Sequence, residues 1–264
     1  MMDVFDAITQ RRSYRRKFRE EPISQVDVDR LIEAARWAPS PFNVQPWELL
    51  IIQESQGKNA LADLTAQSII EQFKEPQFLD DNSHWMRLTE EEWQKQRDGV
   101  LLTDHVDLPP IFTKDPNRMK PLLKNAKHLS ILGHLGAGRK PAEEISGLIR
   151  TSPLLMLILM NCKRRPPGEG GERWMWLGMG AMIQNLLLGA TALRIGTQFI
   201  SAPLERQADR EQIRKIFDIP PVYEIISLLR LGYVDSTRGK SVRLRSSAFV
   251  RYENYSDLAN QKDK

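Results

Sequence analysis

The chain has 264 residues, 41% of them hydrophobic and 27% charged, which suffices for a buried core and excludes a disordered or collagen-like protein. A single cysteine, Cys162, excludes an internal disulfide, and no apolar signal region follows Met1, so we expect a cytoplasmic protein. The longest apolar run, Leu154–Met160, is far below the roughly 20 residues of a membrane span, and the net charge is only +4. We therefore expect neither a membrane nor a nucleic-acid partner.

Hydrophobic spacing predicts the elements in chain order. Helices are expected over 3–10, 25–37, 60–73, 141–149, 174–193 and 207–217, and strands over 47–52, 154–160, 198–201 and 223–231. Asp3 and Ser24 are expected to cap the first two helices, and Gly196 to end the segment before the third strand. The first two expected strands contain the continuous apolar runs Leu49–Ile52 and Leu154–Met160, which are typical of strands buried on both faces.

Helices separate the apolar strands, and this order favours an α/β or α+β sandwich around a central sheet. Periodicity fails within about residues 66–140, where prolines and tryptophans alternate with polar residues. We interpret the chain as a single domain, 1–264, in which this insertion forms a lid or cap. Trp85, Trp93 and Phe112 are the candidate lid aromatics.

The helix expected at 174–193 is apolar nearly all round, which predicts a position at the centre of the molecule. Gly178 and Gly180 would weaken an isolated helix. Their presence indicates that another backbone approaches this helix closely.

Familiar catalytic and metal-binding patterns are missing from the sequence. The four histidines lack metal-ligand spacing, so we expect no metal site. The glycine-rich stretch Gly133–Gly138 lacks the preceding strand of a dinucleotide-binding loop, and Cys162 is interpreted as packing rather than as a nucleophile. We therefore expect no catalytic side chain, and a cofactor would supply the reactive atoms.

Two segments carry the polar groups of a candidate binding site. Arg11, Arg12 and Ser13 follow the first helix, and guanidinium and hydroxyl donors at that density suit a phosphate monoester. Ser40, Asn43 and Gln45 lie in a proline-stiffened loop, where they could hydrogen-bond a heterocycle or a sugar. The alternatives are a basic surface loop and a helix-capping turn. The two basic stretches at 11–17 and 238–245 could likewise meet around one phosphate or form separate patches.

Together these segments resemble the nitroreductase superfamily of flavin enzymes. The likeness rests on R-R-S-Y-R-R-K-F at 11–18, P-I at 22–23 and A-R-W-A-P-S-P-F-N-V-Q-P-W at 35–47. Residues 180–190 resemble the family's central helix and residues 228–233 its last core strand, so the likeness covers 1–65 and 150–250. It implies an α+β sandwich with a mostly antiparallel sheet surrounded by helices, and a long central helix at the core of a homodimer.

The resemblance also implies an FMN site. Arg11, Ser13 and Arg15 would bind the phosphate and ribityl end, and Arg12 would contribute its backbone. Pro39, Ser40 and Asn43 would approach the flavin from the partner subunit, and Gln45 would support their loop. Backbone groups of Ile200, Ser201 and Ala202 would lie near flavin N5, although many relatives have a Glu-Gly pair in this segment. One of Arg243 and Arg245 would complete the phosphate site.

The implied activity is ping-pong hydride transfer from NAD(P)H through flavin N5 to an electron-poor acceptor such as a nitroaromatic, quinone or enone. Other branches of the superfamily fragment flavin, dehalogenate aromatics or oxidise heterocycles in biosynthesis. Ser13 stands where the flavin-fragmenting branch usually carries an acidic residue. A flavin-sequestering protein without turnover is the alternative from a different class.

Overall fold

The computed structural model describes residues 2–104, 114–235 and 240–252. The chain falls into two compact units. Unit 1 comprises Met1–Lys74 with Ile131–Gly239, and unit 2 comprises Glu75–Ser130 with Lys240–Lys264. Each unit is described by itself below.

Unit 1 is built on a four-stranded sheet whose neighbouring strands are all antiparallel. The strands are β1 (Trp47–Ile52), β4 (Leu154–Asn161), β5 (Ile195–Phe199) and β6 (Tyr223–Tyr233), and their order is β1-β4-β6-β5. The predicted α+β class with an antiparallel sheet is therefore confirmed. The central position of β4 explains why all of Leu154–Met160 is buried.

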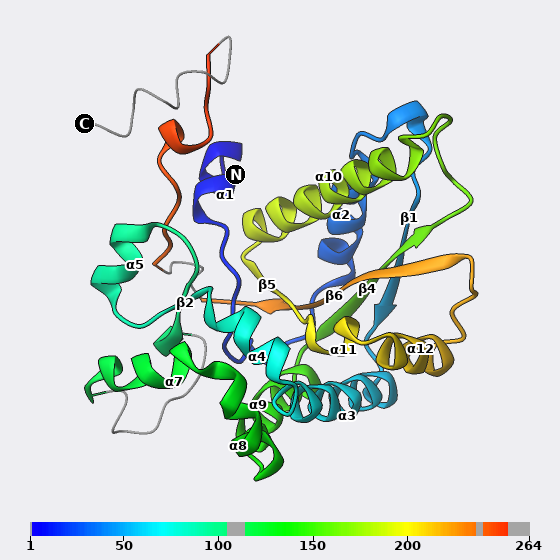
Figure 1. Ribbon diagram of the computed structural model, residues 1–264. Coiled ribbons are helices and arrows are strands. Elements are labelled where there is room, and N and C mark those ends of the chain that lie inside the picture. Colours follow the sequence, from blue (N-terminus) through cyan, green and yellow to red (C-terminus); the bar gives the residue numbers. More distant parts are fainter. Residues whose placement is uncertain (1, 105–113, 236–239, 253–264) are drawn as a thin grey trace. The chain divides into compact units, whose positions relative to one another are not determined.

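Helices cover both faces of this sheet (Figure 1). On one face, alternate residues of β4 from Leu154 to Met160 pack with α2 (Gln25–Arg36) and α10 (Gly171–Ala192). The intervening residues, Leu155, Leu157 and Leu159, share the second core with the helices of the other face. Those helices are α3 (Ser55–Gln72), α9 (Arg139–Arg150) and α12 (Gln207–Ile216). The one-residue alternation of a central strand thus divides the interior into two apolar layers.

The remaining elements of this part of the chain are short. They are α1 (Val4–Gln10), η1 (Pro41–Asn43), α8 (Ser130–His134) and α11 (Ala202–Glu205). Asp3 caps α1 by accepting the amide of Phe5, and Ser24 caps α2 by accepting the amide of Asp27, as predicted.

Two strand predictions need correction. The strand at 47–52 has the predicted bounds and its apolar residues contact both cores, but most of its residues are only half-buried because β1 is an edge strand with one paired neighbour. The strand expected at 198–201 begins at Ile195 and ends at Phe199. Arg194 makes the turn with a φ of 57°, so Gly196 lies inside the strand rather than ending the preceding segment.

The central helix also differs from its prediction. One face of α10 is buried, but Trp174, Trp176 and Leu177 on the other face are 48%, 42% and 57% exposed. The helix therefore covers the sheet of this chain and leaves an apolar face outside it. A Cβ at Gly178 would lie 3.3 Å from the Cβ of Ser40, which confirms the predicted close approach there.

Unit 2 consists of short elements, in agreement with the failed periodicity. They are α4 (Pro76–Ser83), β2 (Met86–Arg87), α5 (Glu90–Gln96), β3 (Val100–Leu101), η2 (Leu102–Asp104), η3 (Pro116–Met119), α7 (Lys120–Lys124), η4 (Ala126–Leu129) and η5 (Ser246–Ala248). The parallel pair of β2 and β3 was not predicted. Among the described helices of the whole chain, none combines the length and the apolar character that a bilayer crossing requires.

Candidate functional site

The arginine-rich segment after α1 lies along the free side of β5. Ser13 pairs with Thr197 as a parallel bridge, and the amide of Tyr14 donates to the carbonyl of Thr197 at 2.8 Å. Further along, the amide of Arg19 donates to the carbonyl of Tyr233 on β6 at 3.0 Å. The predicted polar loop is therefore fixed against the sheet, and its side chains project from a defined backbone.

The end of this segment is anchored by an aromatic ring in a glycine cradle. Phe18 is 4% exposed, and its ring stacks on Tyr14 with 5.4 Å between the centroids. Gly196 and Gly232 are paired across β5 and β6, and a Cβ at Gly232 would lie only 2.5 Å from Phe18. Because glycine has no side chain, the ring fits directly onto the strand backbone.

Arg12 and the neighbouring arginines emerge where α1 ends. Arg11 follows the last residue of the helix, and the Arg12 guanidinium donates to the carbonyls of Thr9 and Arg11, both at 2.7 Å. Arg15 is exposed just beyond Tyr14. The Arg12 guanidinium is thus directed at carbonyls of its own segment. The guanidinium groups of Arg11 and Arg15 and the Ser13 hydroxyl start from within five consecutive positions beside β5, which is a donor set suited to a phosphate.

The loop at 39–45 is held in an unusual backbone conformation. Phe42, Asn43 and Gln45 have φ values of 54°, 51° and 43°, which non-glycine residues seldom adopt. The Ser40 hydroxyl accepts the amide of Gln45 at 3.0 Å, and the Gln45 side chain donates to Asn43 Oδ1 at 3.0 Å. Pro39 and Ser40 rest against Gly178 of α10. The polar groups of the loop are therefore pre-ordered by the loop's own contacts.

In one chain, the two candidate segments lie at opposite edges of the sheet. The 39–45 loop leads into β1, whereas Ser13 lies beside β5, and β4 and β6 separate these two edge strands. Strands are spaced by about 4.8 Å, so three spacings put roughly 14 Å between the edges. The structure thus brings Arg11–Arg15 together with the end of β5 and does not bring the 39–45 loop to them.

A hollow of about 570 Å³ opens where β5 ends. Its apolar lining includes Ile183, Phe199 and Ile200, and its polar lining includes Ser201, Glu205 and Arg210. The carbonyl of Ala202, which follows this lining, accepts the Gln72 side chain at 2.9 Å. This volume is within the range of small-molecule sites. Thr197 and Ser201 are four residues, or roughly 13 Å, apart along an extended chain, so an elongated ligand could touch both the arginine segment and the hollow.

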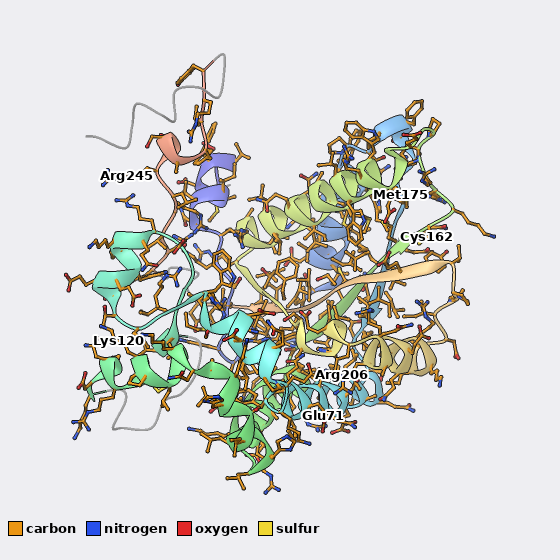
Figure 2. All side chains as sticks on the ribbon, in the orientation of Figure 1. Glu71, Lys120, Cys162, Met175, Arg206 and Arg245 are labelled. Atoms are coloured by element: carbon orange, nitrogen blue, oxygen red, sulfur yellow. The ribbon has the colours of Figure 1, made fainter. Side chains whose placement is uncertain are left out.

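The C-terminal arginines belong to unit 2. Arg243 donates to the carbonyl of Val242 at 2.6 Å, and Arg245, labelled in Figure 2, directly precedes η5. The first residue of the predicted basic stretch, Arg238, lies outside the described residues. The assignment of Arg243 or Arg245 to the phosphate site stays a prediction.

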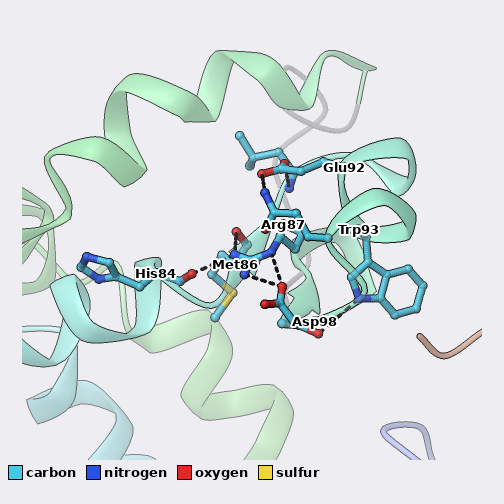
Figure 3. Close-up of polar contacts among 9 residues, drawn as sticks. His84, Met86, Arg87, Glu92, Trp93 and Asp98 are labelled. Carbon is cyan, nitrogen blue, oxygen red and sulfur yellow. Dashed lines mark hydrogen bonds and ion pairs between the residues drawn. The ribbon is translucent and has the colours of Figure 1, made fainter. Parts of the chain in front are cut away.

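Unit 2 contains a smaller hollow of about 370 Å³ beside Arg87. Arg87 donates to Asp98 at 2.7 Å and to the carbonyl of His84 at 2.8 Å, so its guanidinium ties β2 to the residues around it (Figure 3). Trp93 is buried and donates to the carbonyl of Gly99, whereas Trp85 is exposed. The third candidate lid aromatic, Phe112, lies outside the described residues.

The structure shows the surroundings of the glycine-rich stretch Gly133–Gly138 and of Cys162, neither of which is expected to carry chemistry. A Cβ at Gly133 would lie 1.9 Å from the carbonyl oxygen of Phe73, so this glycine allows close packing and the stretch forms no dinucleotide loop. Cys162 was interpreted as packing, and this is wrong because the residue is exposed directly after β4 (Figure 2). Its amide donates to the carbonyl of Val222 at 3.0 Å, next to the last β4–β6 pair, so the backbone is held while the side chain stays exposed.

One residue of the site was missed from the sequence. Arg230 on β6 is fully buried beneath the arginine segment and donates to the carbonyls of Tyr14 and Arg16. The sequence does contain a sign of this residue: Arg230 is the single charged residue in the otherwise apolar run Leu228–Leu231, and a buried strand does not by itself explain a charge there.

The model of the nitroreductase family matches residues 8–233, and the chain therefore belongs to this family. The chain is 35% identical to a NADH dehydrogenase of Thermus thermophilus over 63 residues, which are 24% of this chain and 30% of that protein. It is 23% identical over 238 residues to the 4-nitrobenzoate reductase of Pseudomonas putida, covering 89% of this chain and 87% of the reductase.

A solved structure has a similar fold. Iodotyrosine deiodinase bound to FMN and 3-iodo-L-tyrosine superimposes with a TM-score of 0.55 at 17% identity, covering 96% of this chain and 100% of that chain. The names of the relatives support an oxidoreductase, and the structural likeness supports the fold.

Proposed function

We propose that the protein is an FMN-dependent oxidoreductase that oxidises NAD(P)H and reduces an electron-poor organic acceptor. The observation that carries this proposal is the placement of a phosphate-type donor set beside β5, next to a hollow of apolar and polar lining at the end of the same strand. This arrangement suits a ligand with an anionic group at one end and a ring system at the other. The family membership and the names of the relatives agree with it.

The residues present fit FMN by the chemistry of their donors. Arg11, Ser13 and Arg15, with the backbone of Arg12, would hold the phosphate and ribityl end, completed by Arg243 or Arg245. Residues 200–202 would border the ring. FMN would supply the redox chemistry, and the chain contributes position and electrostatics. A buried cation below the phosphate segment, Arg230, favours an anionic ligand at this place.

A homodimer would complete the site. Pro39, Ser40, Asn43 and Gln45 lie at the far edge of the sheet, so they reach a flavin beside β5 only as residues of a second copy. Apolar side chains exposed on unit 1 supply a surface for that copy, namely Val4, Phe5, Ile8, Trp37, Phe42, Trp174, Trp176 and Leu177. An exposed apolar surface of this kind marks an association site. The segment 66–140 would act as a lid or cap.

The acceptor is proposed from chemistry shared with the relatives. A nitroaromatic, quinone or enone takes up electrons readily, and the apolar residues at the hollow would accommodate a planar ring. The relative from Pseudomonas putida is a reductase of 4-nitrobenzoate. We take nitroaromatics as the first class to assay.

The test is a visible spectrum of the purified protein, followed by anaerobic titration with NADH and NADPH and then with 4-nitrobenzoate or a quinone. We expect a bound flavin spectrum, bleaching by at least one nicotinamide within the turnover time, and return of the colour with the acceptor. A protein that neither carries nor takes up FMN would contradict the proposal. Flavin that is bound but stays oxidised with both nicotinamides would instead indicate a flavin-sequestering protein.

A further inference from the structure

The most unusual buried side chain of unit 1 is the arginine at position 230. Its neighbours Leu228, Leu229 and Leu231 are fully buried, and so is Arg230 itself. Burial lowers the pKa of the Arg230 guanidinium to about 10, which leaves it charged at neutral pH. No carboxylate among the described residues pairs with it. A charge kept in an apolar strand at such cost calls for a specific role.

The contacts of Arg230 point to the arginine segment. Its Nη2 donates to the carbonyls of Tyr14 at 2.9 Å and Arg16 at 2.8 Å, so this one nitrogen holds two carbonyls of the segment. Its Nε donates at 2.6 Å to Oε1 of Gln198, the residue opposite it on β5. The guanidinium also lies 4.3 Å from the centre of the Phe18 ring. Three of these four contacts hold the segment between Ser13 and Arg19, and the fourth fixes the guanidinium to β5.

The remaining nitrogen is informative as well. Nη1 of Arg230 is buried and has no hydrogen-bond partner among the described residues. Within the part of the chain that the structure describes, the positive charge thus faces neutral carbonyls, an amide oxygen and an aromatic ring. A buried cation of this kind makes the overlying segment more favourable for an anion, because the field is weakly screened inside the protein.

We propose that Arg230 is the positioning residue of the phosphate-binding segment: its planar fork sets the backbone from which Arg11, Ser13 and Arg15 reach one phosphate group. The inference rests on the proposed function, since it takes FMN as the ligand. It also specifies which part of FMN binding depends on Arg230: the residue contributes to binding of the phosphate end and not of the ring end. Lysine could replace it only in part, since an ammonium group lacks the separate Nε donor that holds Gln198 while Nη2 holds the two carbonyls.

The test compares two ligands that share the flavin ring. FMN carries the phosphate and riboflavin lacks it, so the ratio of their dissociation constants reports on the phosphate end alone. We expect Arg230→Met to reduce the preference for FMN over riboflavin about tenfold or more, with riboflavin affinity unchanged. Arg230→Lys, which keeps the charge, should restore only part of the preference. Flavin fluorescence titrations measure both constants.

Arg214→Met is the matched control. Arg214 also holds backbone carbonyls in unit 1, those of Pro220 and Tyr223 at 2.9 Å each, but it does not contact the arginine segment. We expect this variant to be less stable than the parent but to keep the parent's ratio of FMN to riboflavin dissociation constants. If Arg230→Met does not fold, Arg230→Lys carries the test, and a ratio equal to the parent's would overturn the inference.

Two further outcomes separate the inference from the proposed function. An Arg230→Met protein that keeps the parent's ratio, or that loses both ligands equally, overturns the positioning role alone. A parent protein that binds neither flavin overturns the proposed function, and the inference with it.

Discussion

Arg11, Arg15 and Arg16 show why identical side chains in one segment differ in their expected roles. All three lie between α1 and Phe18, but the first two are assigned to the phosphate, whereas the assigned contact of Arg16 is its backbone carbonyl, held by Arg230. The side chain of Arg16 is exposed and belongs to no proposed site. The three arginines carry the same charge, so their expected roles differ because of where each one lies on the fixed backbone.

This distinction gives a prediction for single substitutions. Arg11→Ala and Arg15→Ala should each weaken FMN binding by about 1–3 kcal/mol, the usual range for hydrogen bonds to a charged group. Arg16→Ala removes the same charge from the same segment and should leave the affinity within a few tenths of a kcal/mol. Isothermal titration at constant ionic strength measures all three. Equal losses in the three variants would indicate general electrostatic attraction instead.

At the scale of elements, the beginning of α2 is tied to the end of β6. The Tyr233 hydroxyl donates to a carboxylate oxygen of Asp27, in the first turn of the helix. This hydrogen bond is the main reason why the pKa of Asp27 lies below its ordinary value. The contact fixes a cover helix to the strand that also carries Arg230 and Gly232.

The sign of the resulting pH dependence follows from the lowered pKa. A carboxyl group whose pKa is lower in the folded than in the unfolded state stabilises the protein above its ordinary pKa, and this contribution is lost as the pH falls through the lowered value. Tyr233→Phe should therefore reduce the free energy of unfolding by about 1–2 kcal/mol at neutral pH, and the difference should shrink in acid.

Urea titrations at neutral pH and below about pH 4, the ordinary carboxyl pKa, measure this effect. Tyr252→Phe is the control, because Tyr252 is 81% exposed and its variant should match the parent at both pH values. A loss for Tyr233→Phe that is the same at both pH values would exclude Asp27 as its source.

At the scale of the whole molecule, the proposal depends on a second copy of the chain. Gly180 lies on the same exposed side of α10 as Trp174 and Leu177, and a Cβ there would meet no atom of the described residues within 4 Å. Since glycine weakens a helix interior, a use for it outside this chain is expected, and close approach of a partner's backbone provides one.

Gly180→Lys should therefore weaken the proposed homodimer. A charge buried in an apolar interface costs several kcal/mol, which corresponds to a dimer dissociation constant raised on the order of 100-fold. Gly147→Lys is the control, because Gly147 lies within α9 and a Cβ there also meets nothing within 4 Å among the described residues. Sedimentation equilibrium distinguishes the two, and equally tight dimers for both variants would argue against α10 as the interface.

Much of the fold could be predicted from the sequence, because its signals are local. The caps at Asp3 and Ser24 follow from turn chemistry, and the burial of β4 follows from its continuous apolar run. The errors concern the burial of β1 and the bounds of β5, which both depend on the segments packed against these strands. An edge strand and a central strand can have the same apolar run, so the run alone does not predict how deeply a strand is buried. Glycine often ends a segment, but Gly196 lies within β5, where it makes room for Phe18.

By itself, the sequence determined a sandwich of helices around a central sheet. Through its resemblance to one family it predicted the antiparallel sheet, the place of the arginine segment and the 39–45 loop in one pattern, and the donors of an FMN site. Only the tertiary structure decided that these segments occupy opposite edges of one sheet, and that Arg230 lies under the first of them. The physical reason is that donor chemistry is a property of each side chain, whereas strand order and burial depend on contacts between residues more than 200 positions apart, such as Arg230 with Tyr14.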